Sequence, residues 1–245
     1  MKIFRNIRHK LASENLPAGQ AGKVSTYLRY AIGEIILVVI GILIALQINN
    51  WKQKSENLET EKFYLNSLLD NLNEDEKEIA IIIDSQDATK NIRKSLYDLL
   101  RPKEVDKSKI DSTFALFSGM NRTFFPNTAA FNSLKMSGNF GKIKNKALQL
   151  RLSNLYEIIY NRINYNGEFY DRRVENASDK LTNYYDWDKM RFTKWDIVTN
   201  GKLKNMVAFN QEFTNHYINL LNETLENIKH TKELIESEII RINKK

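Results

Sequence analysis

The side chains best suited to metal binding or acid–base catalysis form two Glu–His pairs near the C-terminus. Glu212 lies four residues before His216, and Glu226 lies four residues before His230. This spacing places both members of a pair on one face of a helix, where they offer a metal ion two ligands. The two histidines are fourteen residues apart, about 21 Å along a helix, so they cannot share one ion within a chain. Such pairs are more often surface electrostatics, and we expect no metal site.

The sequence carries no other catalytic signature. It contains no cysteine, which excludes disulfides, thiolate ligands and a cysteine nucleophile. Residues 137–141 (Ser-Gly-Asn-Phe-Gly) lack the Lys-Ser/Thr and the strand-to-helix context of a phosphate-binding loop. They are better interpreted as a helix stop with Gly138 or Asn139 in the left-handed conformation. We therefore expect a protein without enzymatic activity and without a cofactor.

The first structural element that the sequence predicts is an apolar stretch from Tyr30 to Ile48, interrupted only by Glu34 and Gln47. A helix over residues 30–51 would span about 30 Å, the thickness of the bilayer's hydrocarbon core. The stretch is too long for a cleaved signal peptide and is not followed by a small-x-small cleavage pattern, so a retained signal-anchor is favoured. The expected organisation is a short basic tail (1–26), a transmembrane helix (27–50) and an extracytoplasmic domain (51–245).

The net charge of +7 is concentrated ahead of this stretch. Residues 1–29 contain six Lys and Arg against one acid, whereas residues 30–245 contain 31 against 29. Basic residues next to a membrane helix favour the cytoplasmic side and attract anionic lipid. We therefore expect a single-pass protein of the cell inner membrane, with its N-terminus in the cytoplasm and its C-terminal domain in the periplasm. The nearly balanced charge of that domain argues against a nucleic-acid partner.

Three residues of the apolar stretch, Glu34, Gly41 and Ala45, fall on one helix face. The Gly-x-x-x-Ala spacing lets two helices approach closely, and an intramembrane carboxylate normally faces protein or water. This face is a candidate seam for a homo-oligomer. In the alternative interpretation, Glu34 lies one turn inside the cytoplasmic boundary and simply reaches the headgroups.

The rest of the chain predicts an all-α bundle of long helices, consistent with only nine Gly and three Pro. One helix, or two nearly collinear ones, is expected over residues 51–100. Its apolar residues recur every seven positions: Trp51, Leu58, Leu65, Leu72 and Ile79. A second heptad seam comprises Ile218, Leu221, Leu225, Ile228, Lys232, Ile235, Ile239 and Ile242. The two helices are expected to pair antiparallel, with an intermolecular coiled coil as the alternative. Shorter helices are expected at 107–117, 128–136 and 142–165.

Residues 184–195 combine aromatic and charged side chains and are expected to form an ordered loop. Exposed Tyr and Trp together with Arg are typical of interaction hot spots. The candidate partner surface consists of Tyr184, Tyr185, Trp187, Arg191 and Trp195. In the alternative interpretation these rings pack onto the bundle and hold the loop in place.

Two sequence segments resemble segments of a known protein family. The first is Tyr-Ala-Ile-Gly-Glu-Ile at 30–35, continued by Leu-Val-Val-Ile-Gly-Ile-Leu-Ile-Ala-Leu-Gln-Ile-Asn-Asn-Trp at 37–51. The second is Leu-Lys-Met-Ser-Gly-Asn at 134–139. The chain resembles a family of uncharacterised single-pass membrane proteins of Gram-negative bacteria, a domain-of-unknown-function family. The resemblance implies a membrane location and a helical fold, but no activity and no catalytic residues. Residues 16–22 look like an insertion relative to that family.

Two functions fit this reading. The first is a membrane-anchored interaction or assembly module of the cell envelope, with the bilayer and either further copies of itself or another envelope protein as partners. The alternative is an extracytoplasmic domain that senses a small ligand. Because the predicted cytoplasmic segment has only about 29 residues, such a sensor would have to signal through a partner.

Overall fold

The computed structural model describes residues 20–117 and 121–244. The chain divides into two compact units, Met1–Glu59 and Thr60–Lys245. The predicted tail before residue 20 lies outside the described residues. The helices and strands are α2 (Gln20–Leu99), α3 (Lys107–Phe117), α4 (Ala129–Met136), η1 (Phe140–Lys142), α5 (Lys146–Asn154), η2 (Leu155–Ile159), α6 (Tyr160–Leu181), β1 (Tyr185–Asp186), β2 (Arg191–Phe192), α7 (Asp196–Thr199) and α8 (Lys202–Asn243). The prediction of an all-α fold is confirmed.

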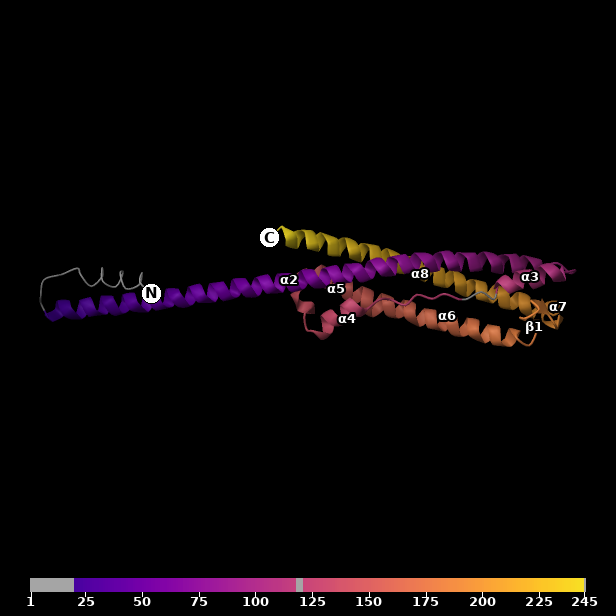
Figure 1. The fold of residues 1–245 in the computed structure, drawn as a ribbon, viewed down its shortest axis with the longest axis horizontal. Coiled ribbons are helices and arrows are strands. Elements are labelled where there is room, and N and C mark those ends of the chain that lie inside the picture. The colour runs from indigo at the N-terminus through magenta and orange to yellow at the C-terminus, as the bar shows by residue number, and fades with distance from the viewer. Residues whose placement is uncertain (1–19, 118–120, 245) are drawn as a thin grey trace. The chain divides into compact units, whose positions relative to one another are not determined.

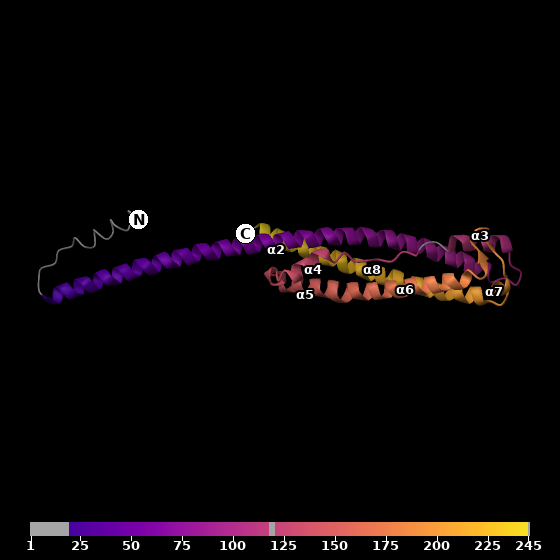
Figure 2. The same ribbon diagram turned by 60° about the horizontal axis from the view of Figure 1, so that its bottom comes forward.

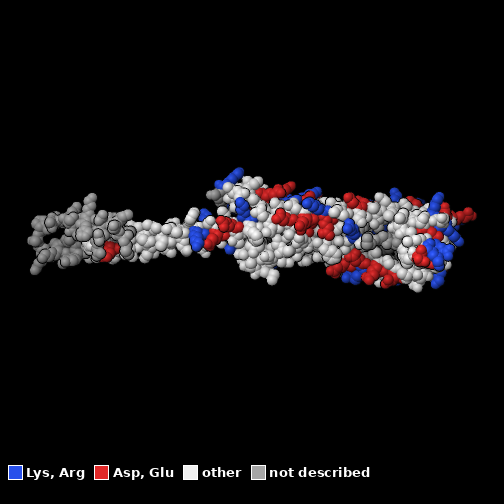
Figure 3. Space-filling view, in the orientation of Figure 1, with Lys and Arg blue, Asp and Glu red and all other residues white. Residues whose placement is uncertain are grey.

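Helix α2 contributes residues to both units. It covers residues 51–99 of the predicted range 51–100 without a break. It ends three residues before Pro102, whose ring disfavours helical conformation in the preceding residue. In the first unit, α2 carries no charged side chain between Glu34 and Lys52, and this part of its surface is correspondingly white in Figure 3. Among the described residues, α2 is the one helix that is long and apolar enough to cross a membrane.

Three long helical segments form the second unit: α2 from Thr60 onwards, α5 to α6, and α8 (Figure 1). Helices α2 and α8 are antiparallel, because Glu76 pairs with Lys232 and the later residue Arg93 bonds to the earlier residue Asn210. The predicted antiparallel pair is thus present within one chain.

A non-helical segment, residues 121–128, runs between α2 and α6 in both ribbon views (Figures 1 and 2). We call it the strap. It leads from the α3 end of the bundle to α4. Helices α2 and α6 are parallel, because Asp75 bonds to Tyr160 and the later residue Gln86 bonds to the later residue Tyr170.

The buried seams of α2 and α8 differ in part from the expected ones. On α2, Leu65, Leu72 and Ile79 are fully buried as predicted, but Trp51 is exposed and Leu58 only half-buried, so the seam begins at Glu61. On α8, the predicted Leu221, Ile228, Ile235 and Ile242 are buried. The intervening seam positions are Tyr217, Thr224, Thr231 and Glu238 rather than Ile218, Leu225, Lys232 and Ile239. Ile218 is also buried, beside this seam.

The middle of the chain also requires corrections. The helix expected at 142–165 begins only at Lys146, because the Asn145 side chain accepts the Leu148 N–H and caps it. It continues through the π-helical turn η2 and α6 to Leu181. The predicted stop at Gly138 is confirmed by its φ of +70°.

Candidate functional site

The predicted helix-packing seam lies on α2 within the first unit. Glu34, Gly41 and Ala45 share one face of a continuous helix. A Cβ atom added at Gly41 would meet no atom within 4 Å, and residues 38–50 are all exposed. The part of this face that carries Gly41 and Ala45 is therefore exposed in the described chain. Its packing against another transmembrane helix stays a prediction.

The aromatic segment 184–195 forms a short hairpin and a helical turn rather than a loop. Strands β1 and β2 pair antiparallel, with Tyr185 opposite Phe192. The ring of Phe114 lies 4.6 Å from that of Tyr185 and 4.8 Å from that of Phe192. Asp111 joins α3 to the hairpin, because its carbonyl accepts the Tyr185 O–H at 3.0 Å and its carboxylate accepts the Phe192 N–H at 2.8 Å. The segment is thus held in place by ring packing and hydrogen bonds.

This packing separates the five residues of the predicted partner surface. Tyr185 is only 2% exposed, so it belongs to the core and must be removed from that surface. Tyr184, Trp187 and Trp195 are half-buried and pack against the same core cluster. Arg191 is exposed. For the four residues that reach the surface, a role in binding a partner stays a prediction.

A set of polar residues buried along the helix seams is the most distinctive feature of the second unit, and the sequence did not predict it. All are at most 5% exposed: Glu61, Asp75, Gln86 and Arg93 on α2, and Asn210, Thr214, Thr224, Thr231 and Glu238 on α8. They follow the same three- and four-residue spacing as the buried Leu and Ile residues. That spacing was a signal in the sequence, but a search for apolar residues alone passes over it.

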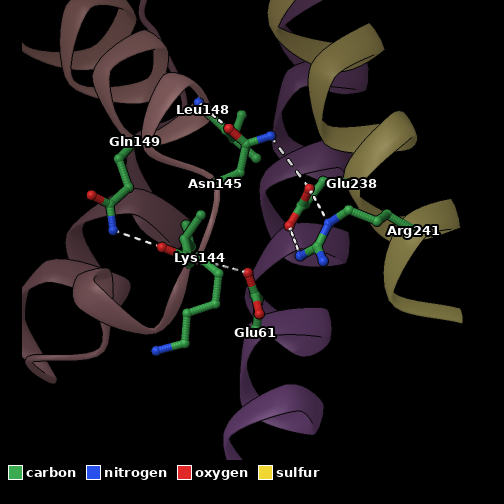
Figure 4. Close-up of polar contacts among 8 residues, drawn as sticks. Glu61, Lys144, Asn145, Leu148, Gln149, Glu238 and Arg241 are labelled. Carbon is green, nitrogen blue, oxygen red and sulfur yellow. Dashed lines mark hydrogen bonds and ion pairs between the residues drawn. The ribbon is translucent and has the colours of Figure 1, made fainter. Parts of the chain in front are cut away.

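The first of three polar layers joins α2, α8 and the turn before α5 (Figure 4). Glu61 Oε1 accepts the backbone N–H of Lys144 at 2.7 Å. Arg241 donates two hydrogen bonds to Glu238, whose carboxylate also accepts the Asn145 amide at 3.3 Å. Burial raises the pKa of the Glu61 carboxyl, and the charge of Glu238 adds to this rise. The Lys144 N–H and the Arg241 charge act in the opposite direction.

The second layer is centred on Asp75, which contacts both α6 and the strap. One carboxylate oxygen accepts the Tyr160 O–H at 2.5 Å, and the other accepts the Asn127 N–H at 2.9 Å. Burial raises the pKa of Asp75 to about 6 and also raises the pKa of Tyr160. Tyr156, in the π-helical turn before Tyr160, stacks on Phe131 with ring centroids 4.4 Å apart. Both tyrosines, four residues apart, face the interior.

The third layer surrounds the hydroxyl of Tyr170. Arg93 Nη1 donates to it at 2.8 Å, and it lies 2.8 Å from Thr214 Oγ1 and 3.2 Å from Gln86 Oε1. The Gln86 amide also donates to the carbonyl of Arg122 in the strap at 2.6 Å. Arg93 Nη1 also lies 3.5 Å from the Asn210 carbonyl, so the buried guanidinium joins α2 to α6 and α8.

These layers are hydrogen-bonded networks that join elements of the bundle, and the predicted Glu–His pairs take no part in them. His216 and His230 are exposed on α8. Within residues 20–117 and 121–244, no three His, Asp or Glu side chains are grouped so that they could hold a metal ion. A shallow depression on α8 is lined by Asn219, Asn222, Glu223, Glu226 and Asn227.

The geometry defines a helical-bundle protein with an apolar N-terminal helix and polar layers in its core. A family model, "Family of unknown function (DUF6090)", matches residues 34–214. The match covers well over half of the chain, so the protein belongs to this family. Comparison with curated proteins and with solved structures finds no match.

Proposed function

We propose that the protein is a single-pass, membrane-anchored interaction module of the cell envelope. In this proposal α2 crosses the inner membrane, the N-terminus lies in the cytoplasm and the helical bundle lies in the periplasm. The bundle acts by binding another envelope protein or further copies of itself.

The observation that carries the proposal is the exposure of the apolar part of α2. An 18-residue window near its N-terminal end has a mean hydropathy of 2.6, and none of it is buried by the rest of the chain. Large apolar surfaces of this kind are normally covered by a membrane or a partner, because their contact with water is unfavourable. The length of the stretch fits the bilayer.

The outer surface of α5 to α6 supports protein binding. Ile158 and Tyr165, seven residues apart, are 61% and 67% exposed, and Leu150 on α5 is also exposed. Apolar residues spaced by two helical turns are the typical anchors by which one helix docks on another.

The decisive experiment is affinity purification of the full-length protein at native level in mild detergent, with mass spectrometry of the retained proteins. We expect a stoichiometric partner or a homo-oligomer. The variant Ile158→Lys combined with Tyr165→Lys should lose it. The matched control Ile81→Lys, at a similarly exposed position on α2, should retain it. A monomer without any retained protein, in all three preparations, would contradict the interaction module.

The proposed orientation has a separate test, because the sequence contains no cysteine. A cysteine that replaces Lys245 should react with a membrane-impermeant maleimide in intact spheroplasts. A cysteine that replaces Lys2 should react only after the membrane is lysed. The reverse pattern would place the bundle in the cytoplasm.

A further inference from the structure

The strap is held largely by side chains of the surrounding helices. Its Phe124 N–H donates to Tyr217 Oη at 2.8 Å, and its Asn127 N–H donates to Asp75 at 2.9 Å. Just beyond the strap, the Ala130 N–H donates to the Asn71 side chain at 3.0 Å. A buried backbone N–H without a partner is costly. The position of the strap therefore depends on whether these few side chains can accept hydrogen bonds.

Asp75 is the buried carboxylate among the described groups that accept hydrogen bonds from the strap, and it is 1% exposed. Two further carboxylates accept hydrogen bonds from strap side chains: Asp171, which is half-buried, from Asn121 and Thr123, and Glu74, which is exposed, from Asn127. The titratable groups that influence Asp75 are Tyr156 of η2 and Tyr160 of α6, and Glu74 and Glu78 on its own helix. The structure records no ion pair to Asp75 in the described part of the chain.

Two neighbouring cations are engaged elsewhere. Lys232 of α8 pairs with Glu76, and Lys135 of α4 pairs with Glu157. The Asp75 carboxylate is thus buried with hydrogen-bond donors but without a balancing positive charge, an arrangement that favours the neutral acid.

We propose that Asp75 is a proton-binding site that controls how firmly the strap is held between α2 and α6. When the carboxylate takes up one proton from water, the buried charge disappears. The carbonyl oxygen of the acid still accepts the Asn127 N–H, and its O–H reaches the Tyr160 hydroxyl. When the proton is lost, the buried charge returns and opening of the strap, which exposes the carboxylate to water, becomes easier. The inference goes beyond the proposed interaction module and requires neither a partner nor a particular orientation.

The direction of the effect follows from linkage. Asp75 has an ordinary pKa of 3.8 when exposed to water, and burial raises the pKa to about 6 in the closed bundle. The closed state therefore binds more protons between these values. The stabilisation of the closed state by the proton on Asp75 is complete below pH 3.8 and is lost as the pH rises through about 6. With a pKa of 3.8 in the open state and about 6 in the closed state, the equilibrium constant for opening of the strap increases about tenfold between about pH 5 and about pH 7.5.

The test is hydrogen–deuterium exchange of the full-length protein in detergent at those two pH values, corrected for the intrinsic exchange rate. In the wild type, protection of strap amides should fall about tenfold at the higher pH. The Asp75→Asn variant, which imitates the neutral acid, should show no such fall. Asp84→Asn makes the same chemical change at an exposed position on the same helix, nine residues away, and should retain the wild-type response.

A second variant covers the case in which Asp75→Asn fails to fold. Tyr160→Phe removes the hydroxyl that favours the ionised carboxylate, so the pH at which protection changes should move upward. Wild-type strap protection that is equal at both pH values would overturn the proposal. So would a pH response that persists unchanged in Asp75→Asn.

Discussion

Two buried threonines on α8, Thr224 and Thr231, offer a controlled test of what the buried polar residues contribute to stability. They are seven residues apart at equivalent seam positions, and both are fully or almost fully buried. Each hydroxyl donates to the carbonyl four residues earlier, at 2.8 Å and 2.7 Å respectively. Only Thr231 has an additional partner, because its oxygen accepts the Nε–H of Arg151 at 3.0 Å. Replacement of each by Val conserves the shape of the side chain.

The expected effects of the two substitutions have opposite signs. In Thr224→Val, the lost hydroxyl bonded only to a carbonyl of its own helix, and the added methyl is buried. The free energy of unfolding should therefore be unchanged or rise by up to about 0.8 kcal/mol. In Thr231→Val, Arg151 loses an acceptor. Hydrogen bonds to charged groups contribute about 1.5–3 kcal/mol, but Arg151 is only half-buried and water can replace part of the bond. We expect a net loss of about 1 kcal/mol.

Thermal unfolding of the full-length protein in detergent, followed by far-UV circular dichroism, measures the difference between the variants. A difference of about 1.5 kcal/mol in the free energy of unfolding between the two variants corresponds to a difference of about 3–6 °C in Tm for a chain of this size. The Arg151→Met background supplies the control, because it removes the donor and should abolish the gap. Equal stability of Thr224→Val and Thr231→Val, or a gap that persists with Arg151→Met, would refute the reasoning.

Three further substitutions test the packing beside the strap, the aromatic hairpin and the apolar part of α2. Gly167→Val should lower the free energy of unfolding by about 1–3 kcal/mol in urea titrations, because even the Cβ atom of a new side chain would lie 3.3 Å from Tyr217 Oη. Phe114→Ala should shift tryptophan fluorescence to longer wavelength, because Trp187, whose ring centroid is 5.8 Å away, becomes more exposed to water. Gly41→Leu should reduce the fraction of oligomers cross-linked in membranes if the predicted seam is used.

Each of these three has a matched control. Gly167→Ala should be milder than the Val variant, because the better helix propensity of Ala offsets part of the crowding; equal stability of wild type and Gly167→Val would argue against close packing at this position. Leu116→Ala, on the exposed side of α3, should leave the fluorescence unchanged. Gly33→Leu lies one residue from the Glu34 face, about 100° around the helix. Its effect should be smaller than that of Gly41→Leu, and equal effects would contradict the seam.

The helix boundaries that were predicted correctly have local causes. Helix α3 matches the expected 107–117, and α4 ends at the predicted glycine stop. The helix expected at 142–165 was misjudged at both ends. Its start depends on the Asn145 cap, and it continues through a π-helical turn into α6. In that continuation Tyr156 stacks on Phe131 and Tyr160 donates to Asp75, partners more than twenty positions away in the sequence, so the local apolar pattern does not show where the helix ends.

The hairpin near residue 190 shows the same limit. Its aromatic residues were recognised, but their partners Phe114 and Asp111 lie more than 70 residues earlier. Whether a Tyr or Trp is a surface anchor or a core residue depends on what lies opposite it. Tyr184 and Tyr185, which are adjacent in the sequence, therefore differ in exposure: Tyr185 is buried and Tyr184 is half-buried.

The sequence by itself determined the features that depend on neighbouring residues: the apolar stretch of α2, the helical periodicity and the all-α class. Tertiary structure decided which face of α8 is central. The apolar pattern favours the column with Leu225 and Ile239, whereas the bundle centres the column with Thr224 and Glu238, about 100° around the helix. The physical reason is that the cost of burying a polar group depends on its partner. The partner of Glu238 on the other side of the bundle, Asn145, comes from a distant part of the chain, and only folding brings the two together.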